Sequence, residues 1–226
     1  MRLAHRNIRW ETLVKGLGPG VIRHGLSDGR WSLIDLLTGV ADAVGPATRL
    51  DLAVWTASGS HGERLREMLA AGRIAALRLM IDRSFVSRQP KTCAVVCDLF
   101  GEVSLRVWSC HAKFAIFTGG RFDVLVTTSA NLNQNRRIEN FGVWCDAEMC
   151  ADYLELVDAL WTAQAAGEGI ADSGRASMLA VLGDREEPEP EPEPEPRRPR
   201  RCRCDACRAW EAKRKRRQYH RRKEAT

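Results

Sequence analysis

The sequence predicts an α/β domain with a mixed, mostly parallel β-sheet flanked by helices on both faces. A chain of 226 residues with 44% hydrophobic and 28% charged residues is typical of a globular protein with one well-formed core. Short apolar or β-branched runs alternate with segments of helical periodicity, an order that produces strands joined by helical crossovers. A glycine turn between two later strand-like runs adds a hairpin, which makes the predicted sheet mixed.

The first half of the chain contains two strand-like runs separated by a helical segment. Residues 32–45 predict a preceding helix, because Ser32 is a capping residue, apolar positions recur at helical spacing and Gly45 ends the pattern. An amphipathic helix follows at residues 62–74. The strand-like runs are residues 49–58 and 75–82.

The second half continues the alternation and then changes to a hairpin. Its two helical segments are residues 90–101 and 147–167. Its three strand-like runs are residues 104–117, 121–131 and 139–146. The glycine-rich turn TGGR joins the first two of these runs, which are therefore expected to pair as a hairpin.

An acidic, proline-rich segment divides the chain. Residues 184–196 read DREEPEPEPEPEP, and alternating proline with like-charged glutamate predicts an extended spacer. This segment carries a net charge of −6, whereas residues 197–226, with 14 Lys and Arg against 3 Asp and Glu, carry +11. We therefore expect a folded domain at residues 1–183, an acidic linker at 184–200 and a basic, cysteine-containing tail at 201–226.

Composition also excludes some classes of protein. No apolar stretch approaches the roughly 18 residues that a membrane-spanning helix needs, and the amino-terminal residues lack the apolar core of a signal peptide. We therefore expect a cytoplasmic protein without a membrane partner. Five cysteines in the predicted domain are expected to be reduced packing residues: Cys93, Cys97, Cys110, Cys145 and Cys150.

A histidine and a lysine two positions apart, His111 and Lys113, lie in the strand-like stretch CHAKFAIF. Residues two apart on a strand project from the same face. An imidazole can attack phosphorus or give a proton to a leaving oxygen, and an ammonium group neutralises the non-bridging oxygens. Because an isolated H-x-K pair is more often an ordinary surface feature, the interpretation depends on what lies beside it.

The partner strand of the predicted hairpin ends in TTSANLNQNRRIENF. Ser129 and Asn131 are expected beside His111 and Lys113, where their hydroxyl and amide groups can donate to phosphate oxygens. A carboxylate such as that of Glu139 fixes the tautomer of a nearby imidazole and stabilises its positive charge. The sequence therefore predicts a phosphoryl-transfer site with His111, Lys113, Asn131 and Glu139 as catalytic residues and Ser129 as a substrate-binding residue.

These motifs resemble those of the phospholipase D superfamily. The matching residues are the H-x-K pair, TSAN at residues 128–131 and EN at residues 139–140, and the resemblance covers about residues 30–165. It implies a phosphodiesterase that forms a phosphohistidine intermediate and needs no cofactor for catalysis. The chain departs from the family at Thr118, where an aspartate is usual, and in a longer gap between His111 and Asn131.

The chain has one H-x-K motif, whereas the family uses two in each active site. The resemblance therefore implies a homodimer in which His111 of one subunit attacks the phosphodiester and the partner subunit's His111 protonates the leaving oxygen. The favoured interpretation is a DNA endonuclease. One alternative is a nucleic-acid-binding protein with little or no catalysis, which Thr118 keeps open. A phospholipid phosphodiesterase is disfavoured because the sequence contains no segment that is expected to insert into a membrane.

The basic tail predicts a nucleic-acid partner, with DNA favoured, because Lys and Arg that neutralise phosphates give strong, salt-sensitive binding. Ribosomal or acidic-membrane association would use the same charge pattern. Four side chains in the pattern C-x-C-x2-C-x12-H predict either a structural zinc site or free thiols: Cys202, Cys204, Cys207 and His220.

A second loop, at residues 56–65, joins a strand-like run to a helix. It predicts either a phosphate-binding turn at the helix amino terminus or, more simply, a helix cap. His61 lies in this loop and is not assigned a catalytic role.

Overall fold

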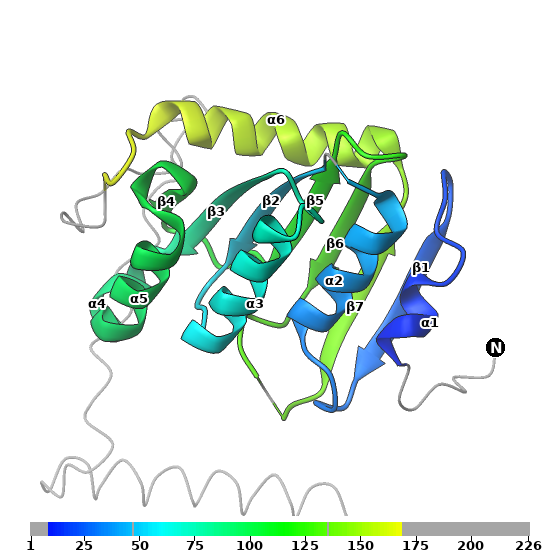
Figure 1. The fold of residues 1–226 in the computed structure, drawn as a ribbon, viewed down its shortest axis with the longest axis horizontal. Coiled ribbons are helices and arrows are strands. Elements are labelled where there is room, and N and C mark those ends of the chain that lie inside the picture. Colours follow the sequence, from blue (N-terminus) through cyan, green and yellow to red (C-terminus); the bar gives the residue numbers. More distant parts are fainter. Residues whose placement is uncertain (1–8, 47, 135, 169–226) are drawn as a thin grey trace, which may run out of the picture. The chain divides into compact units, whose positions relative to one another are not determined.

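The computed structural model describes residues 9–46, 48–134 and 136–168. These residues form a seven-stranded sheet of order β1-β7-β6-β5-β2-β3-β4 with helices on both faces (Figure 1). The strands are β1 (Ile22–Ser27), β2 (Arg49–Val54), β3 (Ala76–Asp82), β4 (Leu105–Trp108), β5 (Phe114–Thr118), β6 (Val124–Thr128) and β7 (Glu139–Trp144). The α-helices are α1 (Trp10–Val14), α2 (Leu33–Val44), α3 (Gly59–Ala70), α4 (Arg83–Arg88), α5 (Pro90–Phe100) and α6 (Ala147–Ala163).

Several predictions on the carboxyl-terminal part fall outside the described residues. These are the domain boundaries after residues 183 and 200, the acidic linker, the basic tail and the possible zinc ligands Cys202, Cys204, Cys207 and His220. Among the helices of the described residues, none combines the length and the apolar character that a membrane span requires.

The α/β architecture with a mixed sheet is confirmed, but the sheet is mostly antiparallel. Parallel pairing occurs between β2 and β3 and between β3 and β4. The other four neighbouring pairs are antiparallel. The prediction of a mostly parallel sheet is wrong because helical crossovers join only β2, β3 and β4; β5, β6 and β7 follow one another through connections without a helix, and such connections place antiparallel strands side by side.

Local sequence signals explain where the helices begin and end. In α2, the backbone N–H of Ser32 donates to Asp35 Oδ2 at 2.7 Å as part of a capping box, and Gly45 ends the helix with φ of +89°. In α3, Ser58 Oγ accepts a hydrogen bond from the backbone of His61 at 3.3 Å. The loop at residues 56–65 is therefore a helix cap, as its simpler interpretation holds.

Two hydrophobic clusters lie on opposite faces of the sheet. The larger cluster packs the sheet against α2, α3 and α5 and includes Leu36, Leu65 and Val96. The smaller cluster lies beneath α6 and includes Val157 and Leu160. Helices on both faces are thus confirmed (Figure 1).

The five cysteines of the described domain are free thiols, as expected from their scattered positions. Cys93, Cys145 and Cys150 are buried, whereas Cys97 and Cys110 are only partly so. Burial raises the pKa of the Cys93 and Cys150 thiols to about 12, which keeps them protonated and unreactive at neutral pH.

Residues 104–117, predicted as one strand, form two separate strands. β4 lies at one edge of the sheet beside β3, whereas β5 lies in the centre between β2 and β6. Residues 109–113 connect the two strands and must therefore pass the carboxyl ends of β3 and β2. His111 and Lys113 lie in this connection, so their predicted position inside a strand is wrong. Their flanking apolar residues mimic one continuous strand because they belong to two buried strands.

Candidate active site

All five residues predicted for the site lie at one edge of the sheet, here called the site edge. β2, β3, β4 and β6 end there, and β5 and β7 begin there, as the register of the paired strands shows. The connections at this edge hold His111, Lys113, Ser129 and Asn131, and Glu139 is the first residue of β7. Ligand sites in open α/β sheets commonly lie outside the carboxyl ends of strands, as here.

The predicted hairpin brings the H-x-K segment beside the end of β6. β5 and β6 pair with Phe114 opposite Thr127, and the backbone N–H of Thr128 donates to the carbonyl of Lys113 at 3.1 Å. Lys113 Nζ donates to the carbonyl of His111 at 2.8 Å, which ties the two residues together. His111 is exposed, and Lys113 is partly buried.

The side chains of Ser129 and Glu139 are hydrogen-bonded to each other. The Ser129 hydroxyl donates to the Glu139 carboxylate in a short hydrogen bond. Ser129 Oγ also accepts a hydrogen bond from the backbone N–H of Asn140 at 3.1 Å. Ser129 is predicted to donate to phosphate, but in this structure its proton points to Glu139. A substrate phosphate would therefore have to compete with that carboxylate for the hydroxyl.

Asn131 is held by the loop that follows β2. Its Oδ1 accepts hydrogen bonds from the backbone N–H groups of Trp55 at 3.0 Å and Thr56 at 3.3 Å. These two bonds fix the side-chain amide and hence the direction in which its NH₂ group donates. The same loop is clamped by a parallel bridge between Ala57 and Leu132.

A second hydrogen-bonded group, which sequence reasoning missed, supports the H-x-K segment from β3. Asp82 ends β3 and accepts from the backbone of Cys110 at 2.9 Å. Its other oxygen accepts from the backbone of Ser84 at 2.8 Å and from the Ser84 hydroxyl in a short bond. Ser84 Oγ in turn accepts from the indole of Trp55 at 2.7 Å. The sequence signal that could have identified Trp55 and Asp82 is their position, since each lies where a buried strand-like run ends.

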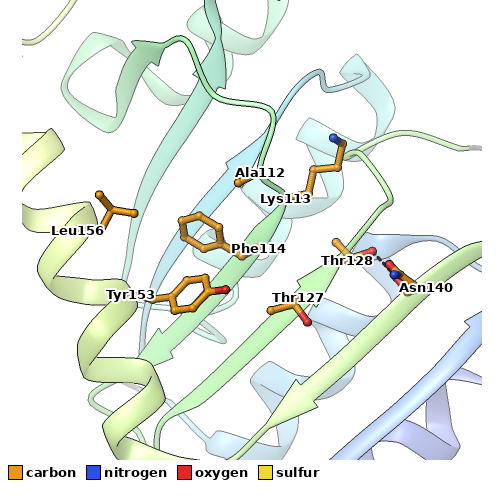
Figure 2. Close-up of a pocket in the computed structure, with 8 residues that line it drawn as sticks. All are labelled: Ala112, Lys113, Phe114, Thr127, Thr128, Asn140, Tyr153 and Leu156. Carbon is orange, nitrogen blue, oxygen red and sulfur yellow. Dashed lines mark hydrogen bonds between the residues drawn. The ribbon is translucent and has the colours of Figure 1, made fainter. Parts of the chain in front are cut away.

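An open pocket of about 340 Å³ lies beside Lys113 on the face covered by α6 (Figure 2). Its apolar side consists of Phe114, Tyr153 and Leu156, with the two rings in edge contact at 5.1 Å. Thr128 and Asn140 form the polar side, where the Thr128 hydroxyl donates to the Asn140 carbonyl at 2.8 Å. The volume lies within the usual range for small-ligand sites.

The ammonium group of Lys113 points away from the aromatic pair of this pocket (Figure 2). Partial burial lowers the pKa of Lys113, and the negative charges of Glu139 and Asp82 act in the opposite direction. Lys113 is therefore expected to lose its charge at a lower pH than an exposed lysine does.

Thr118, where the sequence departs from the motif that it resembles, lies at the far end of β5 from the site edge. It is opposite Arg49, the first residue of β2. It lies five positions after Lys113 along an extended strand, a distance of roughly 16 Å. Thr118 therefore cannot contact the side chains at the site edge of this chain.

Within the described residues, no group of three or more His, Cys, Asp or Glu side chains is placed to hold a metal ion. The side chains that converge at the site edge are instead an imidazole, an ammonium, an amide and a carboxylate. This set suits the binding of a phosphate anion and the transfer of a proton.

Comparison with solved structures finds similar folds, among them those of the following three proteins. Nuc from Salmonella typhimurium, a phospholipase D family member, is 19% identical over 63% of this chain and 94% of its own, with a TM-score of 0.45. NucT from Helicobacter pylori is 11% identical over 63% of this chain and 97% of its own, with a TM-score of 0.45. Phosphatidylserine synthase from Haemophilus influenzae is 10% identical over 63% of this chain and 38% of its own, with a TM-score of 0.42.

No protein-family model and no curated protein matches the sequence. The three structural likenesses concern the fold. The chemistry of the site has to be inferred from its own side chains.

Proposed function

We propose that this protein is a metal-independent phosphodiesterase of the phospholipase D type that cleaves nucleic acid, with DNA as the favoured substrate. The observation that carries the proposal is the meeting of the H-x-K segment with the loop after β6. The backbone N–H of Thr128 donates a hydrogen bond to the carbonyl of Lys113, and Lys113 Nζ donates one to the carbonyl of His111. Asn131 and the hydrogen-bonded pair of Ser129 and Glu139 lie at the same edge of the sheet.

In the proposed first step, His111 attacks the phosphorus atom through an imidazole nitrogen. A phosphorus–nitrogen bond forms, the phosphorus–oxygen bond to the leaving group breaks, and a second imidazole gives its proton to the leaving oxygen. Lys113 and the amide of Asn131 stabilise the negative charge on the non-bridging oxygens. In the second step, water attacks phosphorus, loses a proton to the second imidazole and releases His111.

The second imidazole would come from a second copy of the chain, as the partner subunit's His111 in a two-fold homodimer. The sequence has only one H-x-K motif, so one chain alone cannot supply both groups. We expect sedimentation equilibrium to give twice the chain mass of 25.3 kDa under the conditions of activity. A strict monomer that still cleaves DNA would contradict the two-histidine mechanism.

Plasmid cleavage in excess EDTA tests the proposed function. We expect the wild type to nick or linearise supercoiled plasmid with EDTA present, and the His111→Ala chain to show no cleavage, because both its nucleophile and its acid are gone. Cleavage by both proteins would indicate another site or a contaminant. Cleavage by neither would favour the alternative of a nucleic-acid-binding protein without catalysis.

A further inference from the structure

A tryptophan ring stands next to the proposed nucleophile with its orientation fixed on two sides. Its backbone N–H donates to Asn131 Oδ1, and its indole N–H donates to Ser84 Oγ at 2.7 Å. The centroid of the Trp55 ring lies 6.1 Å from that of His111, with 50° between the two planes. Trp55 is partly exposed rather than buried in either hydrophobic cluster.

A cation lies on the same ring. The guanidinium carbon of Arg88, an exposed residue at the end of α4, is 5.8 Å from the centroid of Trp55. A planar aromatic side chain beside an arginine is the combination with which proteins hold unpaired bases, since the ring stacks on a base and the guanidinium group binds base or phosphate.

We propose that Trp55 and Arg88 form a subsite that stacks one unpaired base of a nucleic-acid strand next to the phosphate attacked by His111. The inference rests on the proposed function and names its substrate class. A strand bound with its phosphate at His111 and Lys113 would carry a base within one nucleotide of Trp55, because the two rings are neighbours. A base inside a duplex is stacked on its own neighbours and cannot present its face to the ring without unpairing. The subsite therefore selects single-stranded or unpaired substrate.

The charges around Trp55 disfavour a cationic lipid headgroup at this place. Tryptophan alone would also attract a quaternary ammonium ion. Here, however, the ring is flanked by Arg88, and Lys113 lies in the adjoining segment. The nearby carboxylate of Asp82 is occupied by three hydrogen bonds from Cys110 and Ser84. An uncharged aromatic base is compatible with these cations, whereas a choline group is repelled by them.

Two substitutions at Trp55 separate aromatic stacking from structural support. Trp55→Phe and Trp55→Leu both remove the hydrogen bond to Ser84, but only phenylalanine keeps an aromatic face. The full-length chain carrying His111→Ala allows binding to be measured without turnover. The probes are a fluorescent oligothymidylate, a set of the same strands with one abasic residue at each position in turn, and the matching duplex. Binding of each probe is followed by fluorescence anisotropy in EDTA. Thermal unfolding of each variant shows whether it is folded.

In this background, Trp55→Leu is expected to weaken binding of the intact single strand about 5- to 150-fold, the range for loss of one base–aromatic stack. Trp55→Phe should weaken it much less, and the abasic strand should be insensitive to either change when the missing base falls at the subsite. Arg88→Ala should weaken binding as well, whereas Arg66→Ala, an exposed arginine on α3, should not.

Equal losses for the phenylalanine and leucine variants, or equal binding of the intact and abasic strands at every position, would overturn the proposed subsite. So would a duplex that binds as tightly as the single strand with the same dependence on Trp55, or competition by phosphatidylcholine vesicles. These outcomes are independent of the proposed catalysis. If the wild type cleaves no phosphodiester but binds single strands through Trp55, the proposed function would be contradicted and the proposed subsite would still be supported.

Discussion

Replacing Lys113 with alanine is expected to lower the rate constant for phosphodiester cleavage about 10²- to 10³-fold, the usual cost of removing one group that stabilises transition-state charge. The loss should appear mainly in kcat, because the charge on the phosphoryl oxygens changes most in the transition state. The measurement is steady-state cleavage of a fluorescent oligonucleotide in EDTA. Lys15→Ala is the matched control, since Lys15 is exposed beside α1.

The pH dependence of the same reaction identifies Lys113 more specifically. In the proposed mechanism its charged form is the active one, and burial lowers its pKa. The rate should therefore fall on the alkaline side at a lower pH than the usual lysine value of 10.5. Arginine keeps its charge at every pH of the assay, so Lys113→Arg should show lower activity but lose this alkaline limb. An unchanged alkaline limb in Lys113→Arg, or a Lys113→Ala chain as active as Lys15→Ala, would contradict the assigned role.

Asp51→Ala is expected to be the most damaging single change to stability among the charged residues of the sheet. The Asp51 side chain is fully buried in β2, where it pairs with Arg49 at 3.0 Å and closely with Arg78 of β3. Arg78 is itself only 14% exposed. Removing the carboxylate leaves a buried guanidinium without its main counter-charge, which typically costs about 3–5 kcal/mol. Urea unfolding should show this loss in the free energy of unfolding, and thermal unfolding should show a melting temperature lower by about 10 °C.

The control for Asp51 is available on the same arginine. Asp158 of α6 also pairs with Arg78, at 2.6 Å, but its side chain is 57% exposed. Asp158→Ala should cost no more than about 1 kcal/mol, because solvent screens an exposed ion pair. If the two alanine variants were equally stable, the buried charge cluster would not hold β2 and β3 as described.

The parts of the fold that could be predicted are those in which local signals agree with burial. Ser32 and Gly45 mark the two ends of α2, and β2 and β3 are read as strands because nearly all their residues are buried. β1 could not be predicted in this way, since five of its six residues are exposed or only partly buried, and its pairing with β7 decides its structure. The short helices α1 and α4 have too few residues to show a period.

The candidate site could be predicted only where it is local in sequence. The hairpin of β5 and β6 places Lys113 beside Thr128, so a turn signal between them was sufficient. Trp55 and Asp82 reach the site from strands that lie far earlier in the chain, and only the tertiary order of the sheet brings them together. Strand direction was missed for the same reason, because periodicity reports burial and not the neighbour with which a strand pairs.

The strand order also determines when a newly made chain can complete its sheet. β1 and β2 follow one another in the sequence but are separated in the sheet by β7, β6 and β5, the last strands to be synthesised. The amino-terminal strands therefore wait with unpaired edges until residues up to Trp144 are available for insertion between them. Such long-range pairing is slow, and insertion of these three strands is expected to limit the folding rate. The growing chain thus carries His111 for some time before the sheet that positions this residue is complete.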